Sequence, residues 1–150
     1  MGTNPVIARV APHFGEEPCI SGANGSGTIF FSGCTLGCVY CQNYEISSLH
    51  RGRKITPQEL ADCYKRLEEQ NVHNINLVTA DHFAPAVVKS FEIYKPKIPI
   101  VYNCSGYTSP KILNTSARLR FIVSNLQKYP LPVDARSLIT FLSRFNASGS

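Results

Sequence analysis

Three cysteines stand close together near the start of the chain, and their spacing is its strongest chemical signal. Cys34, Cys38 and Cys41 form a C-x3-C-x2-C pattern directly behind a short apolar run. Residues 28–32 are rich in β-forming side chains and end at Gly33, so they predict a buried strand that leads into a loop. Loops at the ends of rigid strands commonly carry binding residues, and glycines within this loop let the three thiolates converge.

Three converging thiolates without an evident fourth predict a metal centre with one open coordination position. A cubane [4Fe–4S] cluster normally takes four cysteine ligands. With three, one iron stays open to a ligand from outside the protein, as the fourth position of a catalytic zinc does. The cysteine pattern therefore predicts a cluster that binds a further molecule directly.

The same loop resembles the cluster loop of the radical S-adenosylmethionine (SAM) enzymes. In that superfamily Cys34, Cys38 and Cys41 would hold a [4Fe–4S] cluster, and the amino and carboxylate groups of SAM would chelate the open iron. The aromatic Tyr40 before the last cysteine matches the family pattern and is expected at the cofactor. The flanks, GSGTIFFSGC ending at Cys34 and YCQNYEIS beginning at Tyr40, resemble the pyruvate formate-lyase activating enzyme-like branch.

The resemblance implies a reaction as well as a cofactor. The reduced cluster would pass one electron to the sulfonium of SAM, which would break into methionine and a 5′-deoxyadenosyl radical that abstracts hydrogen from a substrate. The branch implies a glycyl-radical enzyme as protein substrate, and a reductant such as flavodoxin or ferredoxin. The chain is therefore expected to be an iron–sulfur oxidoreductase of this kind.

Two other interpretations of the cysteines stay open. The chain could be a small zinc-binding module in which His50 or another cysteine supplies the fourth ligand. It could also be an inactive truncated fragment that holds no metal or lacks turnover. A disulfide cluster is disfavoured, because the first residues lack the pattern of a secretory signal, and the expected location is a reducing cytoplasm.

Helix signals follow the cysteine loop. Thr56 is a candidate N-cap, with a proline at the first helical position and Glu59 as the capping-box glutamate. An apolar stripe at helical spacing follows, formed by Leu60, Cys63, Tyr64 and Leu67. Residues 83–94 predict a second helix, and a third is expected to begin at Ser109.

Strands alternate with these helices. Residues 75–78 and 98–102 predict two further strands, whereas residues 1–27 are expected to be irregular and residues 51–54 to form a surface turn. The alternation predicts an α/β fold with parallel strands and right-handed crossovers. The resemblance likewise implies the N-terminal portion of a partial (β/α)6 barrel, with about three βα units plus an atypical tail.

Polar residues at the carboxyl ends of the expected strands mark one common site. The family's Gly-Gly-Glu-Pro-like segment is absent after the second strand, where Thr79 and Asp81 are the candidate SAM contacts; Asp81 is equally a candidate helix cap. His82 is favoured as a site residue over a packed ring. Asn103 resembles the asparagine at the third strand end of the family, and Cys104 is expected to be a buried small hydrophobe.

Charge and length limit the other classes of function. The net charge is +5, yet residues 1–116 carry ten Lys/Arg against nine Asp/Glu, and residues 117–150 carry five against one. The body therefore has no basic stripe for nucleic acid, and no apolar run reaches the ~18 residues of a membrane span.

The resemblance covers residues 7–113 and then fades. We expect one unit over residues 1–116, a half-barrel with the cluster loop, and a divergent basic tail over residues 117–150 that is a product of truncation or of a shifted reading frame. Alternatively, the apolar segment 137–145 forms a helix that covers the exposed edge of the third strand.

Overall fold

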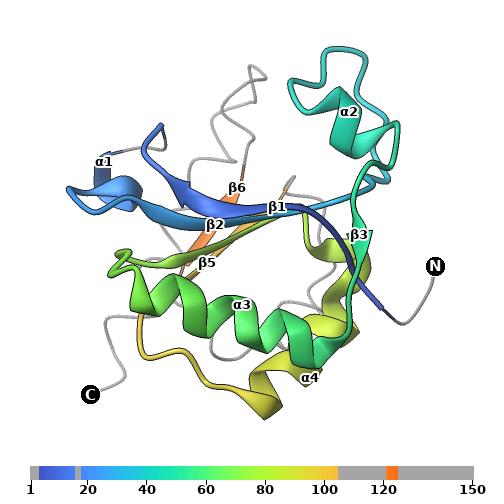
Figure 1. Ribbon diagram of the computed structural model, residues 1–150. Helices are drawn as coiled ribbons and strands as arrows, with labels where there is room; N and C mark the ends of the chain where they lie inside the picture. The colour runs from blue at the N-terminus through green and yellow to red at the C-terminus, as the bar shows by residue number, and fades with distance from the viewer. Residues whose placement is uncertain (1–3, 16–17, 105–120, 125–150) are drawn as a thin grey trace.

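The computed structural model describes residues 4–15, 18–104 and 121–124, and within them a mixed sheet flanked by helices (Figure 1). In chain order the elements are β1 (Val6–His13), α1 (Pro18–Ser21), β2 (Ser26–Phe31), α2 (Tyr44–Ser47), β3 (Arg53–Lys54), α3 (Pro57–Glu69), β4 (Ile75–Val78), the 3-10 helix η1 (Asp81–Phe83), α4 (Ala84–Ile93), β5 (Ile100–Cys104) and β6 (Phe121–Ser124). No helix among these is long and apolar enough to cross a membrane.

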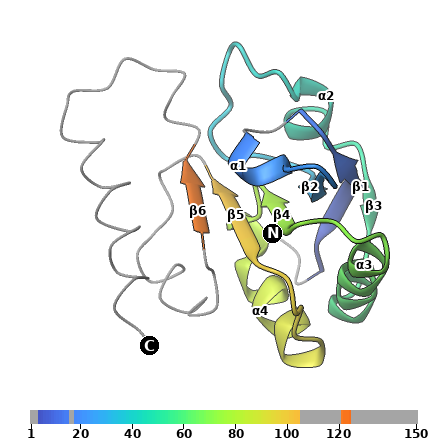
Figure 2. The ribbon, with the colours of Figure 1, turned by 90° about the vertical axis from the view of Figure 1, so that its left-hand side faces the viewer.

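The sheet combines a parallel part with an antiparallel edge. Its strand order is β3-β1-β2-β4-β5-β6 (Figure 2). β2, β4, β5 and β6 pair in parallel, and β1 runs antiparallel to both β2 and β3. The predicted α/β class with parallel strands is confirmed, and the third strand lies two residues later than expected, at Ile100–Cys104. The number of βα units remains a prediction.

The N-terminal region corrects one expectation. Residues 1–27 were expected to be irregular, but β1 occupies Val6–His13 and pairs with β2 over most of its length. β3 pairs with Val6 and Ile7, and within the described part of the chain the rest of β1 is a sheet edge, where a proline such as Pro12 is tolerated. Arg53–Lys54, expected in a surface turn, forms β3 itself.

The far edge of the parallel sheet carries a strand that the sequence patterns did not indicate. β6 lies in the segment expected to be a divergent tail, and it pairs in parallel with β5 from Val101↔Phe121 to Cys104↔Ser124. The edge of β5 is therefore covered by a strand rather than left exposed. The helix expected from Ser109 and the segment 137–145 lie outside the described residues.

The hydrophobic core lies between the sheet and the helices α3 and α4, which both lie below the sheet in Figure 1. The strands contribute Ile29, Phe31, Ile75, Leu77, Ile100, Tyr102 and Cys104, and the helices contribute Leu60, Cys63, Tyr64, Leu67, Val87 and Phe91. Tyr64 stacks on Phe91 with ring centroids 5.3 Å apart, and its hydroxyl lies 2.9 Å from Ser90 Oγ. The expected positions of Cys63 and Cys104 in the core are confirmed.

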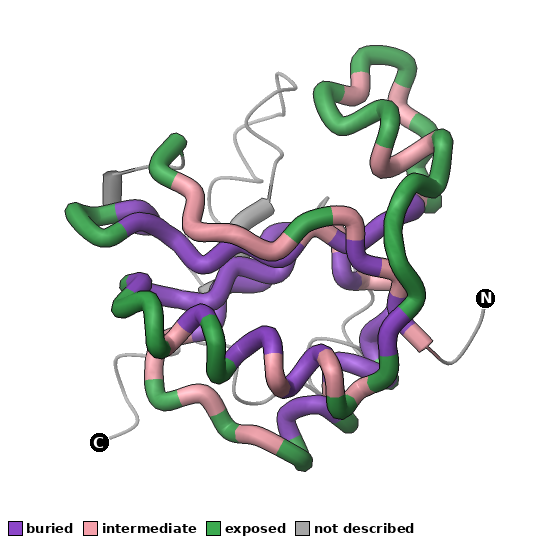
Figure 3. The backbone as a smooth tube through the Cα atoms, in the orientation of Figure 1, coloured by how far each residue is buried: buried purple, intermediate pink, exposed green. Residues whose placement is uncertain are grey.

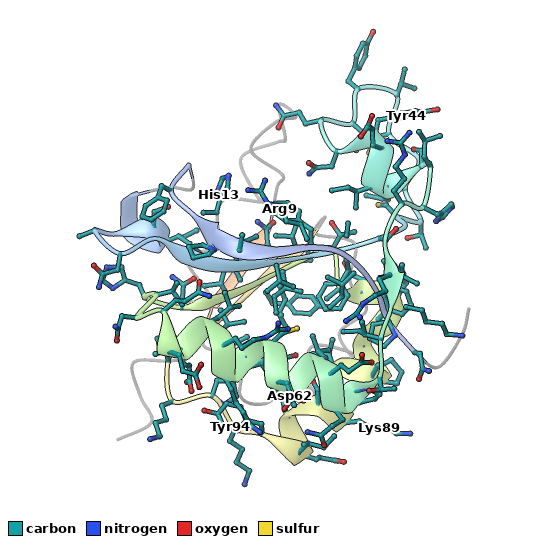
Figure 4. The ribbon with its side chains drawn as sticks, in the orientation of Figure 1. Arg9, His13, Tyr44, Asp62, Lys89 and Tyr94 are labelled. Atoms are coloured by element: carbon teal, nitrogen blue, oxygen red, sulfur yellow. The ribbon has the colours of Figure 1, made fainter. Side chains whose placement is uncertain are left out.

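The opposite face of the sheet carries polar side chains among apolar ones. Side chains alternate along a strand, so Asn76, between the core residues Ile75 and Leu77, points away from α3 and α4. Arg9 and His13 of β1 lie on the same side (Figure 4). Asn76 is 0% exposed, and among the described residues neither its Nδ2 nor its Oδ1 has a hydrogen-bond partner.

The unpaired Asn76 amide should lower the stability of the fold, and this can be tested. A buried polar group without a partner costs about 1–3 kcal/mol, and Leu has the same branching without the polar atoms. We expect Asn76→Leu to raise the free energy of unfolding by about 1 kcal/mol or more, measured by urea denaturation of the full chain. A destabilised variant would show that the amide does have a partner.

The capping box of α3 was predicted and is confirmed. Thr56 Oγ1 accepts a hydrogen bond from the Glu59 N–H at 3.2 Å, and the Thr56 N–H donates to Glu59 Oε2 at 2.7 Å. The backbone N–H and then the hydroxyl of Thr56 lower the pKa of Glu59 below its usual 4.5. Because the pKa of Glu59 is lower in the folded chain, this stabilisation is fully present above the usual value of 4.5 and is lost as the pH falls through the lowered pKa.

Removing the cap should therefore weaken α3 in a defined way. Thr56→Ala is expected to lower the free energy of unfolding by about 1 kcal/mol, because the Glu59 N–H loses its acceptor. Thr56→Ser keeps the hydroxyl and should restore most of the loss. Urea denaturation at neutral pH measures both variants, and an equal loss in the two would contradict the capping explanation.

Candidate metal and cofactor site

The cysteine loop leaves the carboxyl end of β2 and is pinned at its base. The Ser32 N–H donates to the Val6 carbonyl at 2.8 Å, the Gly33 N–H to the Ile46 carbonyl at 3.0 Å, and the Cys34 N–H to the Ser47 carbonyl at 3.2 Å. Ile46 and Ser47 belong to α2, which closes the loop. Entry and exit are thus held together, and the loop with α2 projects from the sheet (Figure 1).

The three predicted ligands share this loop but do not meet. Cys34, Cys38 and Cys41 are free thiols, each partly exposed. Cys41 Sγ lies 3.1 Å from Ser47 Oγ. Over the described ranges, no three His, Cys, Asp or Glu side chains gather as a metal-binding group.

The donor chemistry nevertheless fits an iron–sulfur cluster. Thiolates are the ligands that such clusters take, and these three cysteines are outside disulfides, partly exposed and on one short segment. Most of the loop is exposed or half-buried (Figure 3), so little packing opposes its rearrangement. The residues fit the group, and binding it requires the loop to bring the three sulfurs together.

His82 of η1 contacts the base of the loop from the β4 side. Its Nε2 lies 2.8 Å from the Ser32 carbonyl oxygen, and its ring lies against Phe83 with centroids 4.2 Å apart. The His82 ring is therefore packed and also bonded to the loop, and the expectation that His82 is a site residue stays a prediction.

Thr79, at the end of β4, has an unusual backbone conformation. Its φ is +59°, in the left-handed region that costs a non-glycine residue about 1–2 kcal/mol. Its N–H donates to the Asn103 carbonyl on β5 at 2.9 Å, which holds the conformation. Strained residues of this kind cluster at functional sites.

Asp81 lies beside the end of β5. The Tyr102 hydroxyl is 3.4 Å from Asp81 Oδ1; burial, and then the negative charge of Asp81, raise the pKa of Tyr102. The tyrosine therefore stays protonated and donates to the carboxylate. The N-cap positions of η1 and α4 are Ala80 and Phe83, so the alternative that Asp81 is a plain helix cap does not describe this turn.

The predicted cofactor contacts thus divide into two groups. Thr79, Asp81 and Asn103 lie together where β4 and β5 end. Tyr40 lies on the cysteine loop and is 94% exposed. The nearby Tyr44 of α2 also points outward (Figure 4).

Two residues with roles at the loop carried no signal in the sequence. Ser32 makes three hydrogen bonds at the loop entry, and Ser47 contacts a predicted ligand. Serines at such positions are common in any turn, so only the contacts distinguish them.

The comparison with protein families agrees with this site. The Radical SAM superfamily matches residues 28–129, more than half of the 150 residues. The chain therefore belongs to the radical SAM superfamily, whose members generally use a [4Fe–4S] cluster and SAM. The match includes β6 and extends beyond residue 113, where the sequence resemblance was expected to fade.

One curated relative gives the scale of the match. The chain is 32% identical over 105 residues to the uncharacterized protein MJ0674 of Methanocaldococcus jannaschii, an alignment that covers 63% of this chain and 30% of that protein. The chain thus matches less than a third of the relative's length. No solved structure matches the chain.

The strained backbone at Thr79 can be tested by itself. Thr79→Gly relieves a cost of about 1–2 kcal/mol and adds an entropy cost of about 0.5–1 kcal/mol. We expect a net gain in the free energy of unfolding of about 0.5–1 kcal/mol by urea denaturation. Thr79→Ala keeps the strain and should show no gain; a gain there as well would assign the effect to the side chain.

Proposed function

We propose that this chain binds a [4Fe–4S] cluster through Cys34, Cys38 and Cys41 and binds SAM at the carboxyl edge of its parallel sheet. The observation that carries the proposal is the position of the loop. The three cysteines follow β2 directly, at the edge where β4 and β5 also end, in a chain of the radical SAM superfamily. In such sheets this edge is the usual ligand site.

The chain's own groups take distinct roles in this proposal. The three thiolates would hold the metal and leave one iron open. Thr79, Asp81 and Asn103 supply polar atoms beside it, and Tyr40 would have to move with the loop to reach the cofactor. When bound, the cluster supplies the electron for reductive cleavage of SAM to methionine and a 5′-deoxyadenosyl radical.

The finer proposal concerns the branch and the partners. The flanks of the loop support the pyruvate formate-lyase activating enzyme-like branch, with a partial (β/α)6 barrel, a glycyl-radical enzyme as substrate and a flavodoxin or ferredoxin as reductant. Such a protein works in a reducing cytoplasm. Because the chain matches 30% of its relative, the activity of a whole protein is part of the proposal.

Anaerobic reconstitution with iron and sulfide tests the proposal. We expect about four irons per chain, as in a cubane cluster, and an EPR spectrum of the reduced protein that shifts when SAM is added. Cys34→Ala, Cys38→Ala and Cys41→Ala should each abolish stable iron binding. Cys63→Ala, which removes a buried thiol of α3, is the matched control and should keep the iron.

The other outcomes separate the rival interpretations. Iron without a response to SAM would retain the cluster and reject SAM binding by this chain alone. Stoichiometric zinc in place of iron would reject the proposal in favour of the zinc module. No metal at all, with identical folding of the cysteine variants, would identify an inactive fragment.

A further inference from the structure

We infer that His82 is a positioning residue for the cysteine loop, and that its imidazole N–H on the Ser32 carbonyl sets where Cys34 stands. This inference rests on the proposed function, since it concerns the same loop. It assigns the task of orienting the loop to a residue 48 positions away from Cys34 in the sequence.

The hydrogen-bond geometry defines the role of the ring. A carbonyl oxygen only accepts, so Nε2 of His82 carries the hydrogen in the 2.8 Å contact with Ser32 O. Ser32 also donates its N–H to Val6 of β1 and its hydroxyl to Ile46 of α2. Ser32 thereby joins three segments: β1, the exit of the loop and the turn after β4. His82 supplies the hydrogen bond from the turn after β4.

The imidazole is itself held in place. Its ring lies 4.2 Å from the ring of Phe83, and Phe83 lies 6.1 Å from Phe31, the last residue of β2. Phe83 and Phe31 are both buried core residues. A donor fixed by packing loses little side-chain entropy when it bonds the loop, which is the condition for precise positioning.

Gly33 shows how close the ring approaches the loop. Its φ of +84° is in the left-handed region that favours glycine. A Cβ at this position would lie 3.0 Å from His50 Nδ1 and 3.5 Å from His82 Nε2. A side chain at Gly33 would therefore press on His50 and would touch the His82 ring at ordinary van der Waals distance, so the His82 imidazole lies directly against the residue before Cys34.

Anchoring the entry matters because the rest of the loop must move. Cys38 and Cys41 reach a common metal only if the exposed part of the loop rearranges. A fixed Cys34 reduces the number of thiols that have to be ordered when a cluster binds, and so reduces the entropy cost of binding.

The test compares four forms of the full chain after anaerobic reconstitution with iron and sulfide. They are the wild type, His82→Leu, His82→Gln and His73→Leu. Gln retains an N–H donor near the position of Nε2, whereas Leu has none. His73 is the matched control, because its Nε2 also bonds one backbone group, the Asn24 N–H at 3.1 Å, but at the opposite end of β4.

Two quantities are measured for each form of the chain. The first is the rate at which a ferrous chelator removes iron. We expect His82→Leu to lose iron about tenfold faster than the wild type, which corresponds to about 1.4 kcal/mol, with His82→Gln and His73→Leu within about twofold. The second is amide hydrogen exchange of the apo chain, where His82→Leu should speed exchange at Gly33 and Cys34 and leave α3 unchanged.

The outcomes are separable. Wild-type rates in His82→Leu for both readouts would overturn the inference, as would equal losses in His82→Leu and His73→Leu. Faster exchange throughout α3 would show a general loss of fold and would also overturn it. If the wild type takes up no iron, the proposed function fails, and the exchange at Gly33 and Cys34 alone decides whether His82 holds the loop.

Discussion

The parallel pairing of β2, β4 and β5 is the constraint on which the rest of this structure depends. Parallel strands in register end at the same edge, so loops that are far apart in sequence must meet there. The pairs Phe30↔Val78 and Val78↔Asn103 set that edge. The cysteine loop, the strained Thr79 and the polar end of β5 are neighbours for this reason. The burial of apolar side chains against α3 and α4 supplies the free energy that holds the register.

The two faces of the sheet differ in their side chains. The face toward α3 and α4 is closed by packed aliphatic and aromatic side chains. The other face carries Asn76 and the β1 side chains Arg9 and His13. An unpaired buried amide costs stability, and a sequence shaped only for packing would place an apolar side chain there.

The cysteine loop combines a rigid base with a loose outer part. Hydrogen bonds from Ser32, Gly33 and Cys34 to α2 and β1 hold the base, while Val39 and Tyr40 are almost wholly exposed. Metal sites in which binding completes the ordering of a loop are common, since ligands rarely preassemble without their metal. In the proposed site, the base would fix where the metal binds, and the metal would fix the final shape of the loop.

Local chemistry determined much of this protein from its sequence. The C-x3-C-x2-C spacing, the Thr56 capping box, the strand before Gly33 and the alternation of strands and helices are short-range patterns, and each predicted its element or its candidate ligands. β1 and β6 were not predicted. Prolines obscure the strand pattern of β1, and the four residues of β6 are recognisable as a strand only from their pairing with β5. The contact between His82 and Ser32, the left-handed Thr79 and the proximity of Asp81 to Tyr102 were decided by tertiary structure alone. They join segments 21 to 50 residues apart or arise from a backbone strain that only packed neighbours can hold.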